Sequence, residues 1–250
     1  MDSKWSSPCI SHIVLVLSIC STLINCQSNI FNVVDNGAIA GGRADNKQAF
    51  LDTWTKACKT SGGVFLVPQG TYLLSGAQFG GPCNGQTIVT INGVLIASLD
   101  VTLAVDYWIA FESVKSLTIN GRGTLDGNGA VAWRRPCKDL NTCKLPPTSL
   151  ALDKVSNAQI QDIKSTNSKM FHMSIYESQG VTLNNVTISA PDNSPNTDGV
   201  HIARSSDIRL INSQIATGDD CISIREGSSS VNIMGVFCGP GHGISIGSLG

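Results

Sequence analysis

Short apolar segments recur at regular intervals along this 250-residue chain. Three columns of matching residues align when the segments are superimposed. They are Leu117, Ala158, Val181, Ile208 and Val231, then Ile119, Ile160, Leu183, Leu210 and Ile233, then Gly121, Asp162, Asn185, Asn212 and Gly235. The steps between segments are 41, 23, 27 and 23 residues, and the first fits two turns of the repeat. Repeats of this length made of short strands indicate a solenoid.

A second register is tighter. The segments DGVHI, DCISI and HGISI begin at Asp198, Asp220 and His242 and are separated by 22 residues each. We therefore predict an all-β fold, a right-handed parallel β-helix whose coils stack about 4.8 Å apart. A β-sandwich is the alternative, but it does not explain the equal spacing of the later coils.

One amphipathic helix is predicted ahead of the strands. Asp45 occupies the expected N-cap position, and apolar residues at helical spacing follow it. The run stops at Ser61, which two glycines follow. We expect this short helix to cap the N-terminal end of the solenoid.

The first residues resemble an export signal. Residues 1–26 have an early lysine, an apolar core from Ile13 to Leu23 and a polar exit, which predicts a signal peptide cleaved between Ser21 and Ser28. The apolar core is shorter than the ~20 residues of a membrane span. We therefore expect a secreted protein that is not in a membrane, with residues 27–250 forming the β-helix domain.

Composition narrows the functional classes. The chain is 42% hydrophobic and 14% charged, with a net charge of -1 and no run of lysine or arginine. It therefore lacks the basic surface that nucleic-acid binding requires.

Six cysteines remain after the leader, and an even number in an exported chain predicts three disulfides, for which 15 sets of pairings are possible. The absence of a CxxC pair argues against zinc.

Acidic residues stand where the tight register begins. Strict alternation would bury Asp198 and Asp220 with the aliphatic residues, which is costly for unpaired carboxylates. We infer that both lie in the turn before the strand, so that His201, Ser223 and Ser245 form an outward row lining a groove. Asp219 adds a third carboxylate, and closely spaced carboxylates retain a proton on one group while the others ionise. This pattern favours a glycosidase, which needs a general acid beside a general base.

Three sequence blocks carry a resemblance to a known family. SPNTDGVHI from Ser194, TGDDCISI from Thr217 and CGPGHGISIGSLG from Cys238 resemble the polygalacturonases of glycoside hydrolase family 28, in particular the plant type. FNVVDNGA, GGVFLVPQGTYLL and GRGTLDGNGAVAW extend the resemblance over nearly the whole mature chain.

The resemblance implies inverting hydrolysis of α-1,4-linked galacturonic acid in pectin, without a cofactor or metal. It implies that Asp219 is the general acid, that Asp198 and Asp220 activate water, and that His242 tunes the acid. Acid and base then stand about 6.5 to 9.5 Å apart. The predicted substrate-binding residues are Asn196, His201, Ser223, Gly241, Gly243 and Arg225.

The chain departs from the family at its end. The family's Arg-x-Lys motif, which binds the substrate carboxylate, would fall beyond Gly250, so we expect a C-terminally truncated chain. Arg225 is predicted to supply one cation in its place. The implied location is the plant cell wall. The implied partners are homogalacturonan and a polygalacturonase-inhibiting protein, and the expected state is a monomer.

We expect three disulfides between cysteines that are close in the sequence or lie on neighbouring coils, namely Cys221 with Cys238, Cys58 with Cys83 and Cys137 with Cys143. His172 is expected to be a packed side chain. Asn185 begins an N-glycosylation sequon, but an inward amide ladder would hide it.

The alternative functions are a calcium-dependent pectate lyase and a non-catalytic protein that binds pectin or an inhibitor.

Overall fold

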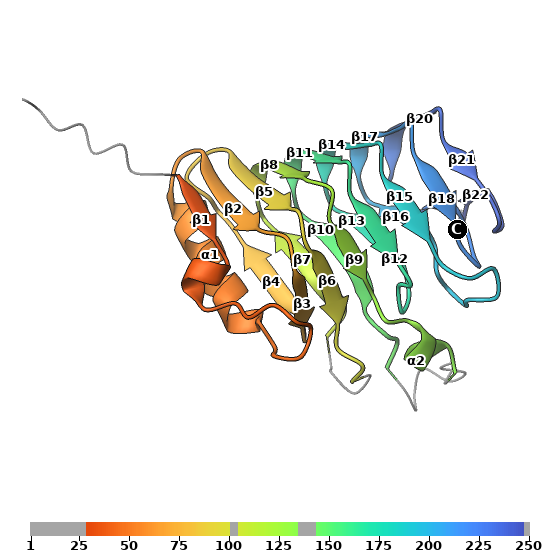
Figure 1. Cartoon of the computed structure of the whole chain (residues 1–250). Coiled ribbons are helices and arrows are strands. Elements are labelled where there is room, and N and C mark those ends of the chain that lie inside the picture. The colour runs from red at the N-terminus through yellow and green to blue at the C-terminus, as the bar shows by residue number, and fades with distance from the viewer. Residues whose placement is uncertain (1–28, 101–104, 135–143, 248–250) are drawn as a thin grey trace, which may run out of the picture.

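The computed structural model describes residues 29–100, 105–134 and 144–247, and these form a parallel β-helix of three sheets (Figure 1). Sheet A comprises β1 (Ile30–Asn32), β2 (Gly63–Val67), β5 (Thr87–Ile91), β8 (Lys115–Asn120), β11 (Ser156–Gln161), β14 (Gln179–Asn184), β17 (Ser206–Ile211) and β20 (Ser229–Met234). Sheet B comprises β3 (Thr71–Leu74), β6 (Val94–Ala97), β9 (Thr124–Asp126), β12 (Lys164–Thr166), β15 (Thr187–Ser189), β18 (Gln214–Ala216) and β21 (Phe237–Cys238). Sheet C comprises β4 (Ala77–Gly80), β7 (Tyr107–Glu112), β10 (Thr148–Asp153), β13 (Met173–Tyr176), β16 (Val200–Ala203), β19 (Ile222–Ile224) and β22 (Ile244–Ile246).

The strand pairing confirms the predicted columns. Val181 is paired with Ala158 on one side and with Ile208 on the other. Their side chains, like those of the second column, point into an apolar core that runs the length of the solenoid. In sheet C, Ile222 is paired with Val200 and Ile244, as the 22-residue register predicts.

The 41-residue step is one coil and not two. Leu117 is paired directly with Ala158, so β8 and β11 belong to successive coils. The additional residues lie in the connection from β9 to β10, which contains the short helix α2 (Ala130–Trp133). A solenoid accepts such an insertion because lengthening a surface loop costs little closure entropy.

The third column forms the corner between sheets A and B. Asp162, Asn185 and Asn212 have left-handed backbones, with φ of 61°, 53° and 50°. The prediction that Asn185 points inward was wrong. It is exposed, and its Nδ2 donates a 2.6 Å hydrogen bond to Asp162 Oδ1, because the left-handed turn directs the side chain out of the strand.

The predicted N-terminal helix is α1 (Lys47–Lys59), which follows the 3₁₀ turn η1 (Val34–Asn36). It begins one residue later than expected, because Asn46 and not Asp45 is the N-cap. The Asp45 carboxylate accepts hydrogen bonds from the backbone N–H groups of Lys47 and Ser75 and from the Ser75 hydroxyl. These bonds tie the start of α1 to the turn between β3 and β4.

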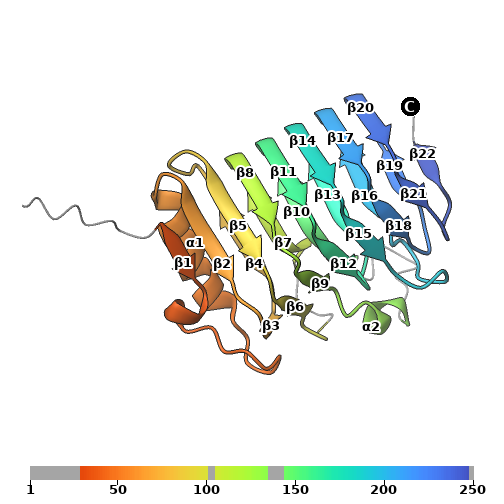
Figure 2. The same ribbon diagram turned by 45° about the horizontal axis from the view of Figure 1, so that its top comes forward.

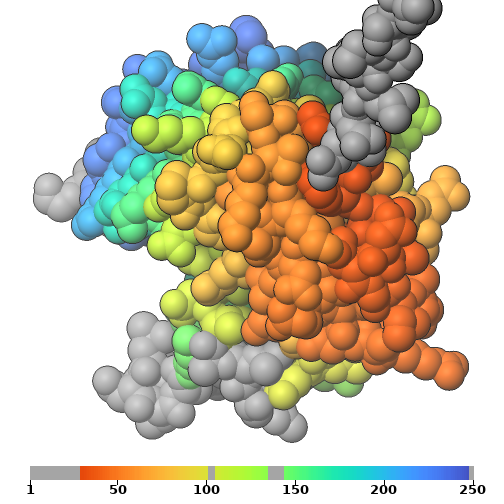
Figure 3. Space-filling view, turned by 90° about the vertical axis from the view of Figure 1, so that its left-hand side faces the viewer, coloured from red at the N-terminus to blue at the C-terminus, as the bar shows by residue number. Residues whose placement is uncertain are grey.

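Helix α1 covers one end of the solenoid, as the view onto that end shows (Figure 3). Trp54 packs against Phe65, Phe79 and Phe111 with ring centroids 5.3 to 6.5 Å apart. The disulfide between Cys58 and Cys83 joins the end of α1 to the β4–β5 connection and confirms one predicted pair.

Two predictions lie outside the described residues, namely the pair Cys137–Cys143 and the signal peptide at residues 1–26. Within the described part of the chain, no helix is long and apolar enough to cross a membrane.

Candidate active site

The predicted acidic residues gather in the connections from sheet B to sheet C. Asp198 lies just before β16, Asp219 and Asp220 just before β19, and His242 just before β22. The three strands lie side by side in sheet C (Figure 2). Gly199 N–H donates to Asp220 O at 2.8 Å, which joins two of the connections directly. The prediction that these acids occupy the turn before each strand is confirmed.

Hydroxyl groups of the outward row hold two of the carboxylates. Ser223 Oγ donates a 2.7 Å hydrogen bond to Asp198 Oδ2, and Ser245 Oγ donates to Asp220 Oδ2. Each serine lies on the coil that follows its aspartate. Both carboxylates therefore act as acceptors in fixed orientations.

His201 extends the contacts of Asp198. Its Nδ1 is 2.8 Å from Ser223 Oγ and 3.6 Å from Asp198 Oδ2. Because the single hydroxyl hydrogen of Ser223 goes to Asp198, the serine oxygen accepts from His201, so Nδ1 carries a hydrogen. This chain of hydrogen bonds holds the carboxylate of Asp198, a residue that is 7% exposed, in one orientation.

Asp219 has different surroundings. His242 Nδ1 is 3.3 Å from Asp219 Oδ1, and Asp220 N–H donates to the same oxygen at 2.9 Å. The Asp219 side chain is 27% exposed, whereas that of Asp198 is 10% exposed. The more accessible carboxylate is thus the one beside the exposed histidine, His242, as expected of a group that exchanges a proton with a substrate.

Glycine allows the acidic loop to pack closely. A Cβ on Gly218 would lie 2.2 Å from Ser194 O, and one on Gly241 would lie 2.6 Å from Asp219 O. The buried Thr197 adds a bond, because its Oγ1 accepts from Gly218 N–H at 3.1 Å. The loop therefore rests directly on its neighbours.

The predicted disulfide between Cys221 and Cys238 is confirmed. It joins the residue that follows Asp220 to the end of β21, next to the connection that carries His242. Gly243 O accepts from Cys221 N–H at 2.7 Å and strengthens the same junction.

Two predicted binding residues lie at the margins. Asn196 is exposed on the turn that leads to Asp198. Arg225 directly follows β19, at the carboxyl ends of the sheet C strands, whereas the acids lie at the amino ends. Its Nε is 3.8 Å from Glu226 Oε2.

Sequence reasoning missed the residues that support His201. The Phe171 ring stacks on the imidazole with centroids 4.3 Å apart and planes 10° apart. The connection containing Phe171 is anchored by Lys169, whose Nζ donates to Ser98 O at 2.9 Å and Gly127 O at 2.6 Å. Burial lowers the pKa of Lys169 to about 8. The sequence carries no local signal for these contacts, because the two residues of each contact are at least 30 positions apart.

Asp219, Asp220 and His242 are close enough to bind a cation, since ligand atoms from all three lie within 4.8 Å of one another. Calcium prefers six to eight oxygen ligands. A set of two carboxylates and an imidazole fits Ca²⁺ poorly, and it matches an acid/base cluster better.

The described residues thus form a parallel β-helix that brings three carboxylates and two histidines together at one edge of sheet C. The sequence profile described as "Glycosyl hydrolases family 28" matches residues 58–250, and the chain belongs to that family.

Individual relatives agree with this assignment. An exopolygalacturonase of Zea mays is 42% identical over 224 residues, covering 88% of this chain and 55% of the relative. A polygalacturonase of Prunus persica is 44% identical, covering 88% of this chain and 57% of the relative. The chain thus spans a little over half the length of these relatives.

Solved structures support the fold. The polygalacturonase from Erwinia carotovora superimposes with a TM-score of 0.70 at 21% identity, covering 83% of this chain and 64% of that one. The family 28 exopolygalacturonase of Yersinia enterocolitica gives a TM-score of 0.72 at 19% identity, covering 88% and 51%.

Proposed function

We propose that this protein hydrolyses the α-1,4-galacturonosidic bonds of pectin with inversion at the anomeric carbon. The observation that carries the proposal is the division of the carboxylates. Asp219 contacts His242 and is partly open to solvent, whereas Asp198 and Asp220 accept serine hydrogen bonds from the following coil. One acid and a pair of bases are the groups that inverting hydrolysis requires.

In this mechanism Asp219 protonates the leaving glycosidic oxygen. His242, at 3.3 Å, orients the acid and compensates its charge after the proton leaves. Asp198 and Asp220 bind the attacking water and remove its proton as the new bond forms. Their hydroxyl bonds keep them as acceptors, which a general base must be.

Substrate contacts follow from the same arrangement. His201 and Ser223 lie on sheet C beside Asp198 and are the nearest side chains to the acids. An added Cβ on Gly243 would meet nothing within 4 Å, so this glycine leaves space next to His242 for a sugar ring, whereas Gly241 packs against Asp219 O. Asn196 contributes an exposed amide two residues before Asp198 in the chain. We also propose secretion to the plant cell wall, where a monomer meets homogalacturonan and an inhibitor protein.

The test is Asp219→Asn in the recombinant chain, assayed for new reducing ends from polygalacturonate and for product anomer by NMR. Loss of the general acid should lower the rate at least 100-fold. The matched control is Asp207→Asn, on β17 in sheet A, which should leave the rate unchanged. Equal rates for wild type and Asp219→Asn would refute the proposal.

Two further outcomes identify the alternatives. Ultraviolet-absorbing unsaturated products that disappear with a chelator would indicate a pectate lyase. Binding of polygalacturonate by the wild-type chain without new reducing ends would indicate a non-catalytic pectin-binding protein.

A further inference from the structure

The Phe171 ring lies one coil ahead of the acids, in the connection from β12 to β13. It is parallel to the His201 imidazole, with centroids 4.3 Å apart and planes 10° apart. In the described part of the chain, His201 makes no other ring contact. A parallel stack covers one face of the imidazole and leaves its edges, which carry both nitrogens, available for hydrogen bonds. The contact therefore restrains the plane of the imidazole without competing for either nitrogen.

The plane of the imidazole decides whether its Nδ1 can reach Ser223. The χ2 torsion of histidine is broad and roughly two-fold, so the torsion alone does not fix the plane. The His201 side chain is 17% exposed, and the surrounding packing encloses it only in part. The stack selects the plane, and the 2.8 Å contact from Nδ1 to Ser223 Oγ selects one of the two orientations within it.

Ser223 carries this orientation on to Asp198. Ser223 is 4% exposed, and its single hydroxyl hydrogen is donated to Asp198 Oδ2 at 2.7 Å. Because His201 donates to the serine oxygen, the hydroxyl hydrogen is directed away from the imidazole and toward the carboxylate. Asp198 Oδ1 makes no hydrogen bond with the described residues. One carboxylate oxygen is thus fixed, while the other is left for a further donor.

The backbone that carries Phe171 is held by earlier coils. Its carbonyl oxygen accepts hydrogen bonds from Ser149 N–H at 3.0 Å and from Ser168 Oγ at 2.7 Å. Both serines are buried, and Ser149 Oγ donates to Ser168 Oγ at 2.7 Å. The indole of Trp133, in α2, donates to Ser168 O at 3.1 Å. These bonds do not involve the Phe171 ring, so the ring can be replaced without removing the support of its backbone.

We propose that Phe171 is a positioning residue for Asp198, and this rests on the function proposed above. The ring fixes the plane of His201, and His201 directs the Ser223 hydroxyl to Asp198 Oδ2. Asp198 Oδ1 then faces the attacking water in one orientation and removes its proton. Phe171 touches neither the water nor the sugar in this arrangement, and it acts only through the imidazole.

The first test compares Phe171→Leu, which keeps the apolar volume but removes the flat ring, with Phe171→Tyr, which keeps the ring. An aromatic stack favours one orientation by about five- to tenfold, so kcat on polygalacturonate should fall by about that factor in Phe171→Leu. KM should change by less than about threefold, because the loss falls on the step that Asp198 catalyses. Phe171→Tyr should keep kcat within about twofold of the wild type, since it restores the stack.

A double-mutant cycle tests the route through the imidazole. In a His201→Gln chain there is no ring plane to fix, so Phe171→Leu should lower kcat by less than about twofold further. The same five- to tenfold loss in both backgrounds would show that Phe171 acts independently of His201, and it would overturn the proposal.

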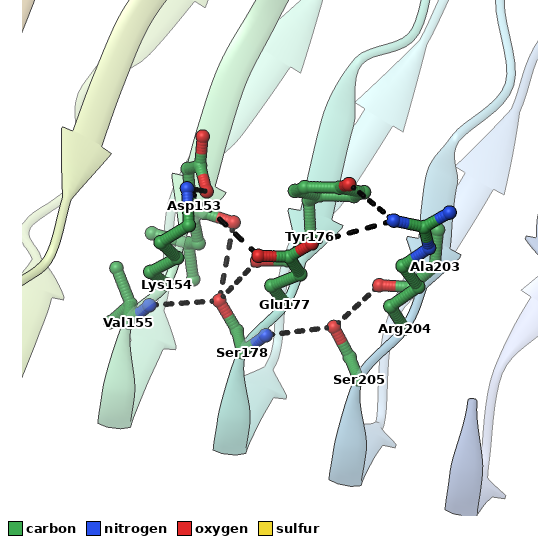
Figure 4. Close-up of polar contacts among 10 residues, drawn as sticks. Asp153, Lys154, Val155, Tyr176, Glu177, Ser178, Ala203, Arg204 and Ser205 are labelled. Atoms are coloured by element: carbon green, nitrogen blue, oxygen red, sulfur yellow. Dashed lines mark hydrogen bonds and ion pairs between the residues drawn. The ribbon is translucent and has the colours of Figure 1, made fainter. Parts of the chain in front are cut away.

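A control for general destabilisation lies at the other end of β13 (Figure 4). Ser178 is buried, accepts a hydrogen bond from Val155 N–H at 2.9 Å and donates to Tyr176 O at 2.9 Å. These bonds hold the corner between sheets C and A, whereas the acids lie at the amino ends of the sheet C strands. Ser178→Ala should lower the melting temperature but leave kcat unchanged. Equal losses of kcat in Ser178→Ala and Phe171→Leu would assign the effect to stability and overturn the proposal.

A spectroscopic readout is independent of hydrolysis. The proton on His201 Nδ1, assigned by its loss in His201→Gln, should give an NMR signal in the wild type, in Phe171→Tyr and in Ser178→Ala. It should disappear through solvent exchange in Phe171→Leu. A signal that survives Phe171→Leu, or an unchanged kcat in that variant of an active chain, would overturn the proposal. Loss of the signal in Phe171→Leu, in a protein whose wild type forms no reducing ends, would support the positioning and count against the hydrolase.

Discussion

At the scale of single residues, burial separates two histidines that the sequence presents alike. His242 is 68% exposed beside Asp219, whereas His172 is fully buried, which confirms its predicted packed position. The Nδ1 of His172 lies 2.9 Å from Ser165 Oγ, and the Nε2 of His172 has no hydrogen-bond partner among the described residues. Burial lowers the pKa of His172 from 6.5 to about 3.

This pKa predicts acid sensitivity. The unfolded chain binds a proton at His172 below pH 6.5, while the folded chain does so only near pH 3. The free energy of unfolding should therefore fall as pH drops from 6.5 toward 3, by at most about 1.4 kcal/mol per pH unit from this residue. Chemical denaturation of His172→Gln should show a shallower dependence on pH.

The control is His242→Gln, which removes an exposed imidazole. In this variant the free energy of unfolding should depend on pH almost as it does in the wild type. If His172→Gln and wild type lose stability in parallel between pH 6.5 and 4, the buried imidazole is not the cause.

At the scale of elements, the connection between β18 and β19 depends on contact with the turn before β16. Gly218 lies against the Ser194 backbone, and Thr217, fully buried, has its hydroxyl 3.3 Å from Asp219 O. The acids are thus positioned by one loop resting on another. A methyl group added at Gly218 must displace the backbone of Ser194, because the nearest atoms are backbone atoms and not the end of a flexible side chain.

We expect Gly218→Ala to lower the free energy of unfolding by about 1 to 3 kcal/mol, as overpacking does. It should also reduce hydrolysis, because the displaced loop carries Asp219 and Asp220. Thermal denaturation and the reducing-end assay test both effects. Gly80→Ala is the matched control, because its added Cβ meets nothing within 4 Å; equal effects of the two substitutions would contradict this account.

At the scale of the whole molecule, packing differs between the two ends of the described solenoid. Trp54 of α1 is 4% exposed among three phenylalanine rings, and its Nε1 donates to Gly80 O at 3.0 Å. Phe237 on β21, toward the other end, is 75% exposed. We therefore expect these two aromatic residues to contribute unequally to stability.

Trp54→Ala should lower the free energy of unfolding by about 3 to 5 kcal/mol, the cost of emptying a packed aromatic site. Phe237→Ala should change it by less than about 0.5 kcal/mol, as exposed substitutions do. Urea denaturation of both variants provides the comparison. A comparable loss from each would show that burial does not set the contribution of these rings.

Much of the fold and the acidic cluster was predictable because the relevant patterns are local. The 22-residue register placed Asp198, Asp220 and His242 on successive coils, and the pairing confirms it. Neighbouring coils likewise indicated the disulfide between Cys221 and Cys238. Coil length was less predictable, because a loop insertion imitates an additional turn.

The sequence by itself determined the solenoid, its register and the residues that gather at one edge, because strand periodicity and repeat length are properties of the chain alone. Only the tertiary structure decided which groups contact one another across coils. The Phe171 stack on His201, the Ser223 bond to Asp198 and the Arg204 bond to Tyr176 join residues 25 to 30 positions apart. Such contacts depend on side-chain direction, which no one-dimensional pattern specifies.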